Sequence, residues 1–119
     1  MRHRNFYITT PIYYPSGNPH MGHAYSSILA DVFARFKRND NFNVHFLTGT
    51  DEHGLKIQRS AEKAGKGHQA FCDKISQTFR DLSDTLNLSN TDFIRTTEAR
   101  HKKTVQHLWN ELEKNDDIY

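Results

Sequence analysis

The sequence of 119 residues has very little cysteine and no long apolar run. Cys72 is its single cysteine, which excludes an internal disulfide and fits a reducing compartment. No apolar stretch approaches the length of a membrane span, and the start, "MRHRNFYITT", lacks the apolar stretch of a secretory signal. These absences predict a cytoplasmic protein without a membrane partner.

Strong charge of either sign is also absent. The formal net charge is +2 at pH 7, which is too weak to indicate a nucleic-acid-binding protein by itself. Hydrophobic residues make up 35% and charged residues 25% of the chain, so a packed core can form although the chain is rather polar. The length fits one domain or part of a larger one.

Strand and helix patterns alternate along the chain. Aromatic and β-branched residues and short apolar runs predict strands at 6–10, 42–49 and 92–95. Apolar residues at steps of three and four predict helices over 21–36, 55–64, 71–86 and 101–112. Such alternation is typical of an α/β layer fold with a parallel sheet. Three strands make a small sheet, so we expect half of a nucleotide-binding domain.

The caps of two helices are predicted from the residues before them. Asn18 is a suitable N-cap for the first helix, with Pro19 as its first residue. Thr96 or Thr97 is expected to cap the last helix.

The segment "GNPHMGH", residues 17–23, enters the first helix from the loop after the first strand. Ligands of open parallel sheets bind at the carboxyl ends of the strands, and free N–H groups at a helix start attract phosphate. His20 and His23 lie about one helical turn apart, and an imidazole can donate a hydrogen bond to phosphate. Gly22 lets a flat group approach the backbone closely.

The segment "GNPHMGH" has three other interpretations. A standard P-loop is rejected, because His23 stands where lysine is needed and Ala24 where serine or threonine would bind magnesium. A zinc site with His53 as third ligand is disfavoured, because no cysteine or carboxylate cluster accompanies the histidines. On spacing alone, His20 and His23 are equally well explained as surface residues at a helix start.

A second polar cluster, "TGTDEHG" at residues 48–54, follows the second strand. Asp51 there can pair with an ammonium group, or it can cap the following helix. Tyr13 and Tyr14 either line an apolar pocket or pack in the core.

Together these segments resemble one family. "PHMGH" resembles the His-x-Gly-His signature of class I aminoacyl-tRNA synthetases. "YITTPIYYPSGNPHMGHAYSSILADVFARF" and "FLTGTDEHGLKIQRSAEKAG" look like methionyl-tRNA synthetases specifically, and "DFIRTTEARHKKTVQ" continues the match. The resemblance runs from Phe6 to Tyr119.

The resemblance implies a Rossmann-like domain that activates methionine with ATP and transfers it to tRNA(Met). His20 and His23 are then the catalytic residues, which contact the ATP phosphates and stabilise the transition state. Gly22 accepts the adenine, Asp51 binds the methionine ammonium with backbone groups of Ile12, and Tyr14 closes over the substrate. The implied ATP-binding residues are Gly17, Asn18, Pro19, His20, Gly22 and His23. ATP is expected to arrive with Mg²⁺.

Several parts of the family pattern do not occur in these residues. The lysine-rich second signature, the cysteines of the inserted zinc domain and the anticodon-binding domain are missing. We therefore expect residues 1–119 to be the N-terminal half of the catalytic domain, inactive alone, with no metal of its own and zinc only in the inserted domain. A non-catalytic nucleotide-binding module and a class I synthetase of another specificity are the alternatives, although "PIYYPSG" and "TGTDEHG" speak against the second.

Overall fold

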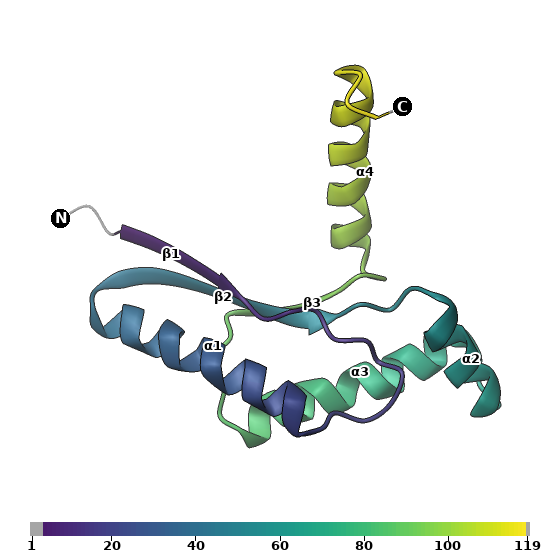
Figure 1. Cartoon of the computed structure of the whole chain (residues 1–119), viewed down its shortest axis with the longest axis horizontal. Helices are drawn as coiled ribbons and strands as arrows, with labels where there is room; N and C mark the ends of the chain where they lie inside the picture. The colour runs from purple at the N-terminus through teal and green to yellow at the C-terminus, as the bar shows by residue number, and fades with distance from the viewer. Residues whose placement is uncertain (1–3, 119) are drawn as a thin grey trace.

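The computed structural model describes residues 4–118 and has an α/β fold (Figure 1). Its elements are β1 (Arg4–Thr9), α1 (Met21–Asn39), β2 (Phe42–Thr50), α2 (Leu55–Lys63), α3 (His68–Thr85), β3 (Asp92–Arg95) and α4 (Ala99–Lys114). The strands form one parallel sheet in the order β1-β2-β3. The predicted fold class, strand direction and number of elements are therefore confirmed, with shifts of one to three residues at most element ends.

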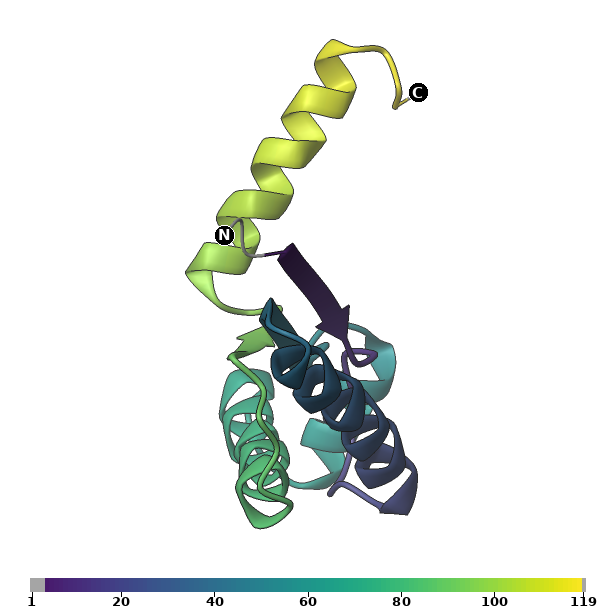
Figure 2. The same cartoon turned by 90° about the vertical axis from the view of Figure 1, so that its left-hand side faces the viewer.

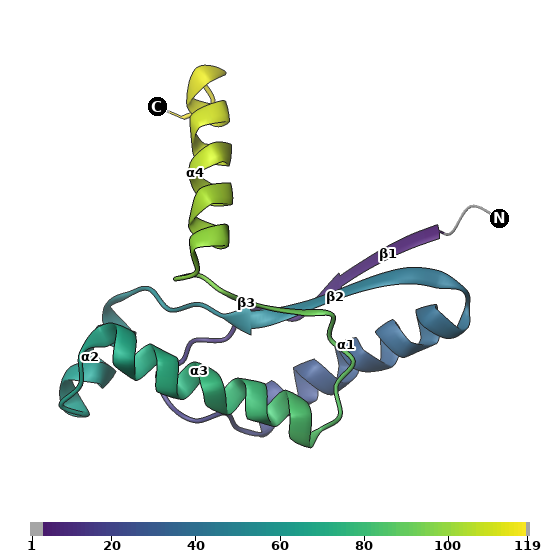
Figure 3. The ribbon, with the colours of Figure 1, turned by 180° about the vertical axis from the view of Figure 1, so that it is seen from behind.

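The helices are distributed unequally over the sheet. α1 and α3 lie on the same face, while α4 projects away from the body on the other side (Figures 2 and 3). Among residues 4–118, no helix combines the length and apolar character needed to cross a membrane.

Two apolar clusters hold α1, α2 and α3 to the sheet. The first joins α1 to the strands through Ala30, Ala34, Val44 and Phe46. The second lies around α2 and α3 and contains Tyr13, Ile57, Ala61, Phe71, Cys72, Ile75, Phe79 and Phe93. Burial raises the pKa of the Cys72 thiol to about 11, so this side chain stays protonated at neutral pH and serves as a packing group.

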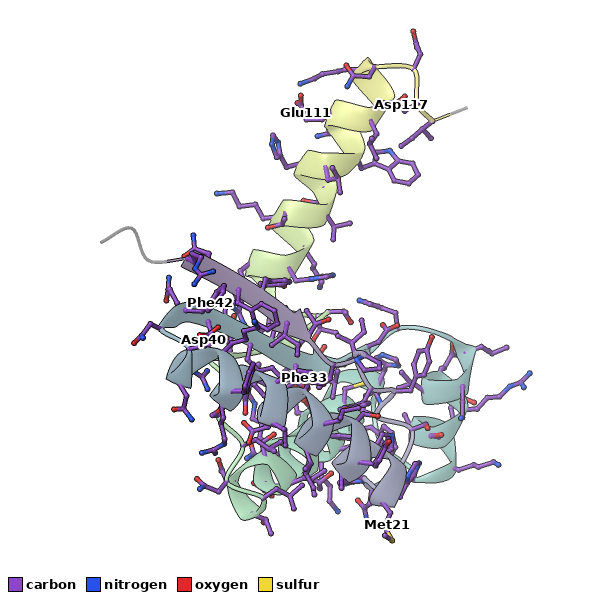
Figure 4. The ribbon with its side chains drawn as sticks, turned by 60° about the vertical axis from the view of Figure 1, so that its left-hand side comes forward. Met21, Phe33, Asp40, Phe42, Glu111 and Asp117 are labelled. Carbon is purple, nitrogen blue, oxygen red and sulfur yellow. The ribbon has the colours of Figure 1, made fainter. Side chains whose placement is uncertain are left out.

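The helix α1 packs on the sheet with small residues rather than with its large apolar ones. Ser27, Ala30, Asp31 and Ala34 are the buried positions of α1. The large residues of the predicted apolar face are exposed: Met21, Tyr25, Ile28, Leu29, Val32, Phe33 and Phe36. Figure 4 shows Met21 pointing away from the body at the start of the helix. Periodicity identifies the residues that share a helical face. It does not show which face packs on the sheet, and here α1 packs on β2 with the face that carries Ala30 and Ala34.

The helix α4 also differs from its prediction. Its N-cap is Glu98, not Thr96 or Thr97, and none of its residues is buried. Its apolar residues Val105, Leu108, Trp109 and Leu112 are exposed in the described structure. Thr96 and Thr97 instead form hydrogen bonds with Glu52, just beyond the end of β2.

Gly49 is required by the close pairing of β2 with β3. It lies opposite Ile94 in the parallel register, and a Cβ at this position would come within 1.9 Å of the Ile94 carbonyl oxygen. Such an overlap with backbone cannot be relieved by rotating a side chain.

We therefore expect Gly49→Ala to destabilise the chain by about 3 kcal/mol or more, because β3 must move away from β2. Urea unfolding followed by circular dichroism measures this change. Gly17→Ala is the control, because a Cβ at Gly17 meets no atom within 4 Å. Similar stabilities for the two variants would contradict the steric role of Gly49.

Candidate functional site

The carboxyl ends of the three strands meet at one edge of the sheet, as the parallel topology requires. Backbone hydrogen bonds tie the loop after β1 to β2 and the residue after it, among them those from Tyr13 N–H to the Gly49 carbonyl (2.9 Å) and from Asp51 N–H to the Tyr13 carbonyl (2.8 Å). The segment after β3 is tied there by Thr96 N–H, which donates to the Thr50 carbonyl (3.2 Å). Both predicted polar clusters therefore lie at the same edge.

The two histidines cap the start of α1 reciprocally. His20 is the N-cap, and its Nδ1 accepts from Gly22 N–H at 3.0 Å. The Nδ1 of His23 accepts from His20 N–H at 3.0 Å. The prediction that Asn18 caps the helix and Pro19 begins it is wrong, because two imidazole nitrogens satisfy the free N–H groups two residues later.

This capping arrangement determines which nitrogen of each ring carries the proton. Because both Nδ1 atoms accept hydrogen bonds, each neutral ring has its proton on Nε2. The ring centroids of His20 and His23 are only 3.9 Å apart. The start of α1 therefore holds two adjacent rings, each with an Nε2–H donor.

His23 is partly enclosed by aromatic side chains. Its ring packs against Tyr13 at 4.8 Å and Phe79 at 5.0 Å between centroids. Burial lowers the pKa of His23, and the nearby charge of His20 lowers it further. Both effects favour the neutral ring.

A glycine is needed at position 22 because the His20 side chain lies over the backbone there. A Cβ on Gly22 would lie 2.9 Å from His20 Cε1 and 3.1 Å from His20 Nδ1. The glycine therefore lets the His20 ring reach the Gly22 N–H. This local reason does not depend on any ligand.

A pocket of about 530 Å³ lies in front of the histidines. It is lined by Pro11, Ile12, Tyr13, Tyr14, Ser16, Gly17, Asn18, His20, His23 and Lys56. Six of the predicted site residues are thus brought together, namely Ile12, Tyr14, Gly17, Asn18, His20 and His23. The predicted residues Pro19, Gly22 and Asp51 do not line this pocket. Lys56, in the first turn of α2, is a lining residue that the sequence analysis missed.

Both proposed roles of the tyrosine pair occur, one on each residue. Tyr13 is buried, stacks on Phe79 and shares a hydrogen bond of 2.9 Å with the Ser27 hydroxyl. Tyr14 is exposed at the pocket. Tyr13 therefore supports the pocket from the core, while Tyr14 is available at its surface.

Asp51 does not cap the next helix. The N-cap of α2 is Gly54, with a φ of 111°, and no side chain caps it. Asp51 Oδ1 instead accepts long hydrogen bonds from His53 N–H and from the Thr96 hydroxyl, both 3.4 Å. The capping alternative is thus wrong.

Glu52, beside the candidate site, is a buried carboxylate that the sequence analysis missed. Its side chain is completely buried and pairs with the Arg95 guanidinium at 2.6 and 3.0 Å. Burial alone would raise the pKa of Glu52, but hydrogen bonds from Arg95, Thr97 and Thr50 outweigh it and lower the pKa. The available signal was the position of Arg95 at the end of the third predicted strand, at the same sheet edge as "TDE", although the pairing itself depends on the register of β2 with β3.

The zinc alternative is not assembled in the described part of the chain. Residues 4–118 contain no group of three or more histidine, cysteine, aspartate or glutamate side chains arranged to hold a metal ion. The His53 ring lies against the Thr96 carbonyl oxygen at 3.3 Å instead.

The depressed pKa of His23 predicts a loss of stability in weak acid. A histidine whose folded pKa lies below its ordinary value of about 6.5 stabilises the fold above that pH, and the contribution is lost as pH falls through the folded pKa. Protonation also removes the Nδ1 acceptor of the cap. We expect the unfolding midpoint in urea to fall between pH 7 and pH 5.

His23→Gln is the matched variant, because glutamine can accept the same capping hydrogen bond and does not titrate. It should lose less stability than the wild type over this pH range. Equal pH dependence of the two proteins would show that His23 does not contribute.

Comparison with known proteins shows the family of the chain. The family model described as "tRNA synthetases class I (M)" matches residues 6–119. The chain is similar to a mitochondrial methionine–tRNA ligase of Takifugu rubripes, with 57% identity over 92% of the chain and 18% of the relative. It is 52% identical to methionine–tRNA ligase 1 of Bacillus cereus over 98% of the chain and 18% of that protein.

A solved structure has the same fold. The crystal structure of Mycobacterium tuberculosis methionyl-tRNA synthetase bound by methionyl-adenylate matches 98% of the chain and 23% of its own length, with a TM-score of 0.95 and 46% identity. The chain thus spans 18% to 23% of the length of these relatives. The family match over residues 6–119 and the identities of 52% and 57% lead to one conclusion: the chain belongs to the methionyl group of class I tRNA synthetases.

Proposed function

We propose that the chain is the N-terminal part of the catalytic domain of a cytoplasmic methionine–tRNA ligase. The complete enzyme activates methionine with ATP to methionyl-adenylate and transfers the methionyl group to tRNA(Met). The supporting observation is the pair of Nε2–H donors at the start of α1, in a pocket at the carboxyl edge of the sheet. The inserted zinc domain, second signature and anticodon-binding domain are proposed for the remaining length.

In the activation step, a methionine carboxylate oxygen attacks the α-phosphorus of ATP. The bond from that phosphorus to the bridging oxygen of the β-phosphate breaks, and pyrophosphate leaves with the electron pair. Negative charge grows on the phosphate oxygens in the transition state. His20 and His23 meet this charge with their Nε2–H donors, held in place by the capping hydrogen bonds.

The remaining ATP contacts come from the loop before α1. Gly17 and Asn18 line the pocket, and Gly22 leaves room for the His20 ring beside it. Pro19, in the same loop, is proposed to contact ATP as well. The adenine is proposed to lie against Gly22. Mg²⁺ is proposed to enter with ATP, bound to its phosphate oxygens.

Methionine is proposed to bind beside Asp51. The Asp51 carboxylate pairs with the substrate ammonium, backbone groups of Ile12 add hydrogen bonds, and Tyr14 covers the amino acid. Tyr13 supports this arrangement, because its carbonyl binds Asp51 N–H and its ring packs on His23.

His20→Asn separates capping from catalysis. Asparagine caps helices well, so the stability of the protein should change little. The lost Nε2–H donor should slow methionine-dependent ATP–pyrophosphate exchange by about 10²- to 10³-fold in the full-length enzyme. Exchange at the wild-type rate would contradict the catalytic role, and so would a rate loss that merely follows a loss of folded protein.

Asp51→Asn should weaken methionine binding far more than ATP binding. Without the carboxylate charge, the substrate ammonium loses a partner worth about 2–3 kcal/mol, or about 30- to 150-fold in affinity. Calorimetry with each substrate measures the difference. Asp40→Asn, at the other end of α1, is the matched control (Figure 4). Unaltered methionine affinity in Asp51→Asn would exclude this role and favour a non-catalytic module.

A further inference from the structure

Thr96 makes polar contacts with four successive residues at the end of β2 and just beyond it. Its N–H donates to the Thr50 carbonyl (3.2 Å), and its carbonyl lies 3.3 Å from His53 Nε2. Its hydroxyl accepts from Glu52 N–H at 2.8 Å and donates to Asp51 Oδ1 at 3.4 Å. Thr96 itself is only 5% exposed. Thr96, directly after β3, thus holds the segment that carries Asp51 through these contacts.

The hydroxyl of Thr96 has one hydrogen to donate, and its direction is restricted. One lone pair of Oγ1 is occupied by the short bond from Glu52 N–H. The hydrogen is therefore turned toward the Asp51 carboxylate. Asp51 Oδ1 also accepts from His53 N–H, whereas no residue in the described part of the chain donates to Oδ2.

We propose that Thr96 is a positioning residue for methionine binding, which holds Asp51 Oδ1 so that Oδ2 is presented to the substrate ammonium. The proposal rests on the proposed role of Asp51. A carboxylate can rotate about its Cβ–Cγ bond, and a donor on one oxygen fixes the plane in which the other oxygen is offered. The two 3.4 Å contacts are long enough to tighten when the ammonium arrives.

The neighbours of Thr96 keep its hydroxyl in place. Arg95 and Thr97 both donate to the buried carboxylate of Glu52. This anchoring on either side leaves Thr96 little freedom to move away from Asp51. It also provides a control, because Thr97 has the same side chain and a hydrogen bond to the same segment but does not contact Asp51.

The test compares hydroxyl removal at these two positions in the full-length enzyme. Thr96→Val keeps the β-branched shape and removes the hydroxyl, Thr96→Ser keeps the hydroxyl, and Thr97→Val is the matched control. Methionine and ATP dissociation constants are measured separately by calorimetry, together with the thermal midpoint of each variant. Asp51→Asn and the double variant with Thr96→Val complete a cycle.

Thr96→Val should weaken methionine binding by about five- to tenfold, with ATP binding changed less than about twofold. Thr96→Ser and Thr97→Val should each stay within about twofold of the wild type for methionine. In the Asp51→Asn background, Thr96→Val should cause no further loss, because the carboxylate it positions is gone.

Different results overturn different claims. If Asp51→Asn weakens methionine but Thr96→Val does not, the inference on Thr96 fails and the proposed function stands. Equal methionine losses in Thr96→Val and Thr97→Val, or additive losses in the double variant, also overturn it, since both indicate general loosening. If Asp51→Asn has no effect, both proposals fail. Should Thr96→Val not fold, Thr96→Ala is measured in its place against the same limits.

Discussion

The fully buried carboxylate of Glu52 holds together the carboxyl ends of β2 and β3. Glu52 is paired with Arg95, which also binds Asp73 of α3, so one guanidinium joins the ends of β2 and β3 to a helix. Removing one partner of such a pair leaves a buried charge at a cost of about 3–5 kcal/mol. The strand ends therefore cannot separate without losing this pair. The backbone of Glu52 is held as well, since its carbonyl oxygen lies 2.8 Å from His68 Nε2.

The His-x-Gly-His spacing has a local structural reason in addition to its proposed chemical role. A capping box needs side-chain acceptors three residues apart, and His20 and His23 provide them with their Nδ1 atoms. Gly22 leaves room for the first ring to fold back. The same hydrogen bonds that complete the helix start also orient both Nε2–H groups, so helix capping and the arrangement of the donors are one structural feature.

The sequence predicts the parallel α/β fold and the edge where the site lies, because periodicity and strand–turn–helix order are local properties. It does not predict the packing face of α1. Spacing shows which residues share a helical face, but which face meets the sheet depends on how closely the helix approaches β2. It also misses Glu52 and the role of Thr96. Their contacts join residues 43 and 45 positions apart, and only the register of β2 with β3 brings them together. Asn18 was favoured as a cap by propensity, which does not anticipate an imidazole in that position.

The charges at this edge determine the order of the substrates in the proposed complex. Tyr13 stands between two chemically opposite groups, with its carbonyl bound to Asp51 N–H and its ring against His23. An amino acid with its ammonium at Asp51 and a nucleotide with its phosphates at the Nε2–H donors must approach each other across this residue. In this proposed order the ammonium is held at Asp51, so the methionine carboxylate lies on the side of the phosphates. Both of these groups are anionic and repel each other. The Nε2–H donors of His20 and His23 are therefore proposed to offset this repulsion when the carboxylate attacks the α-phosphorus.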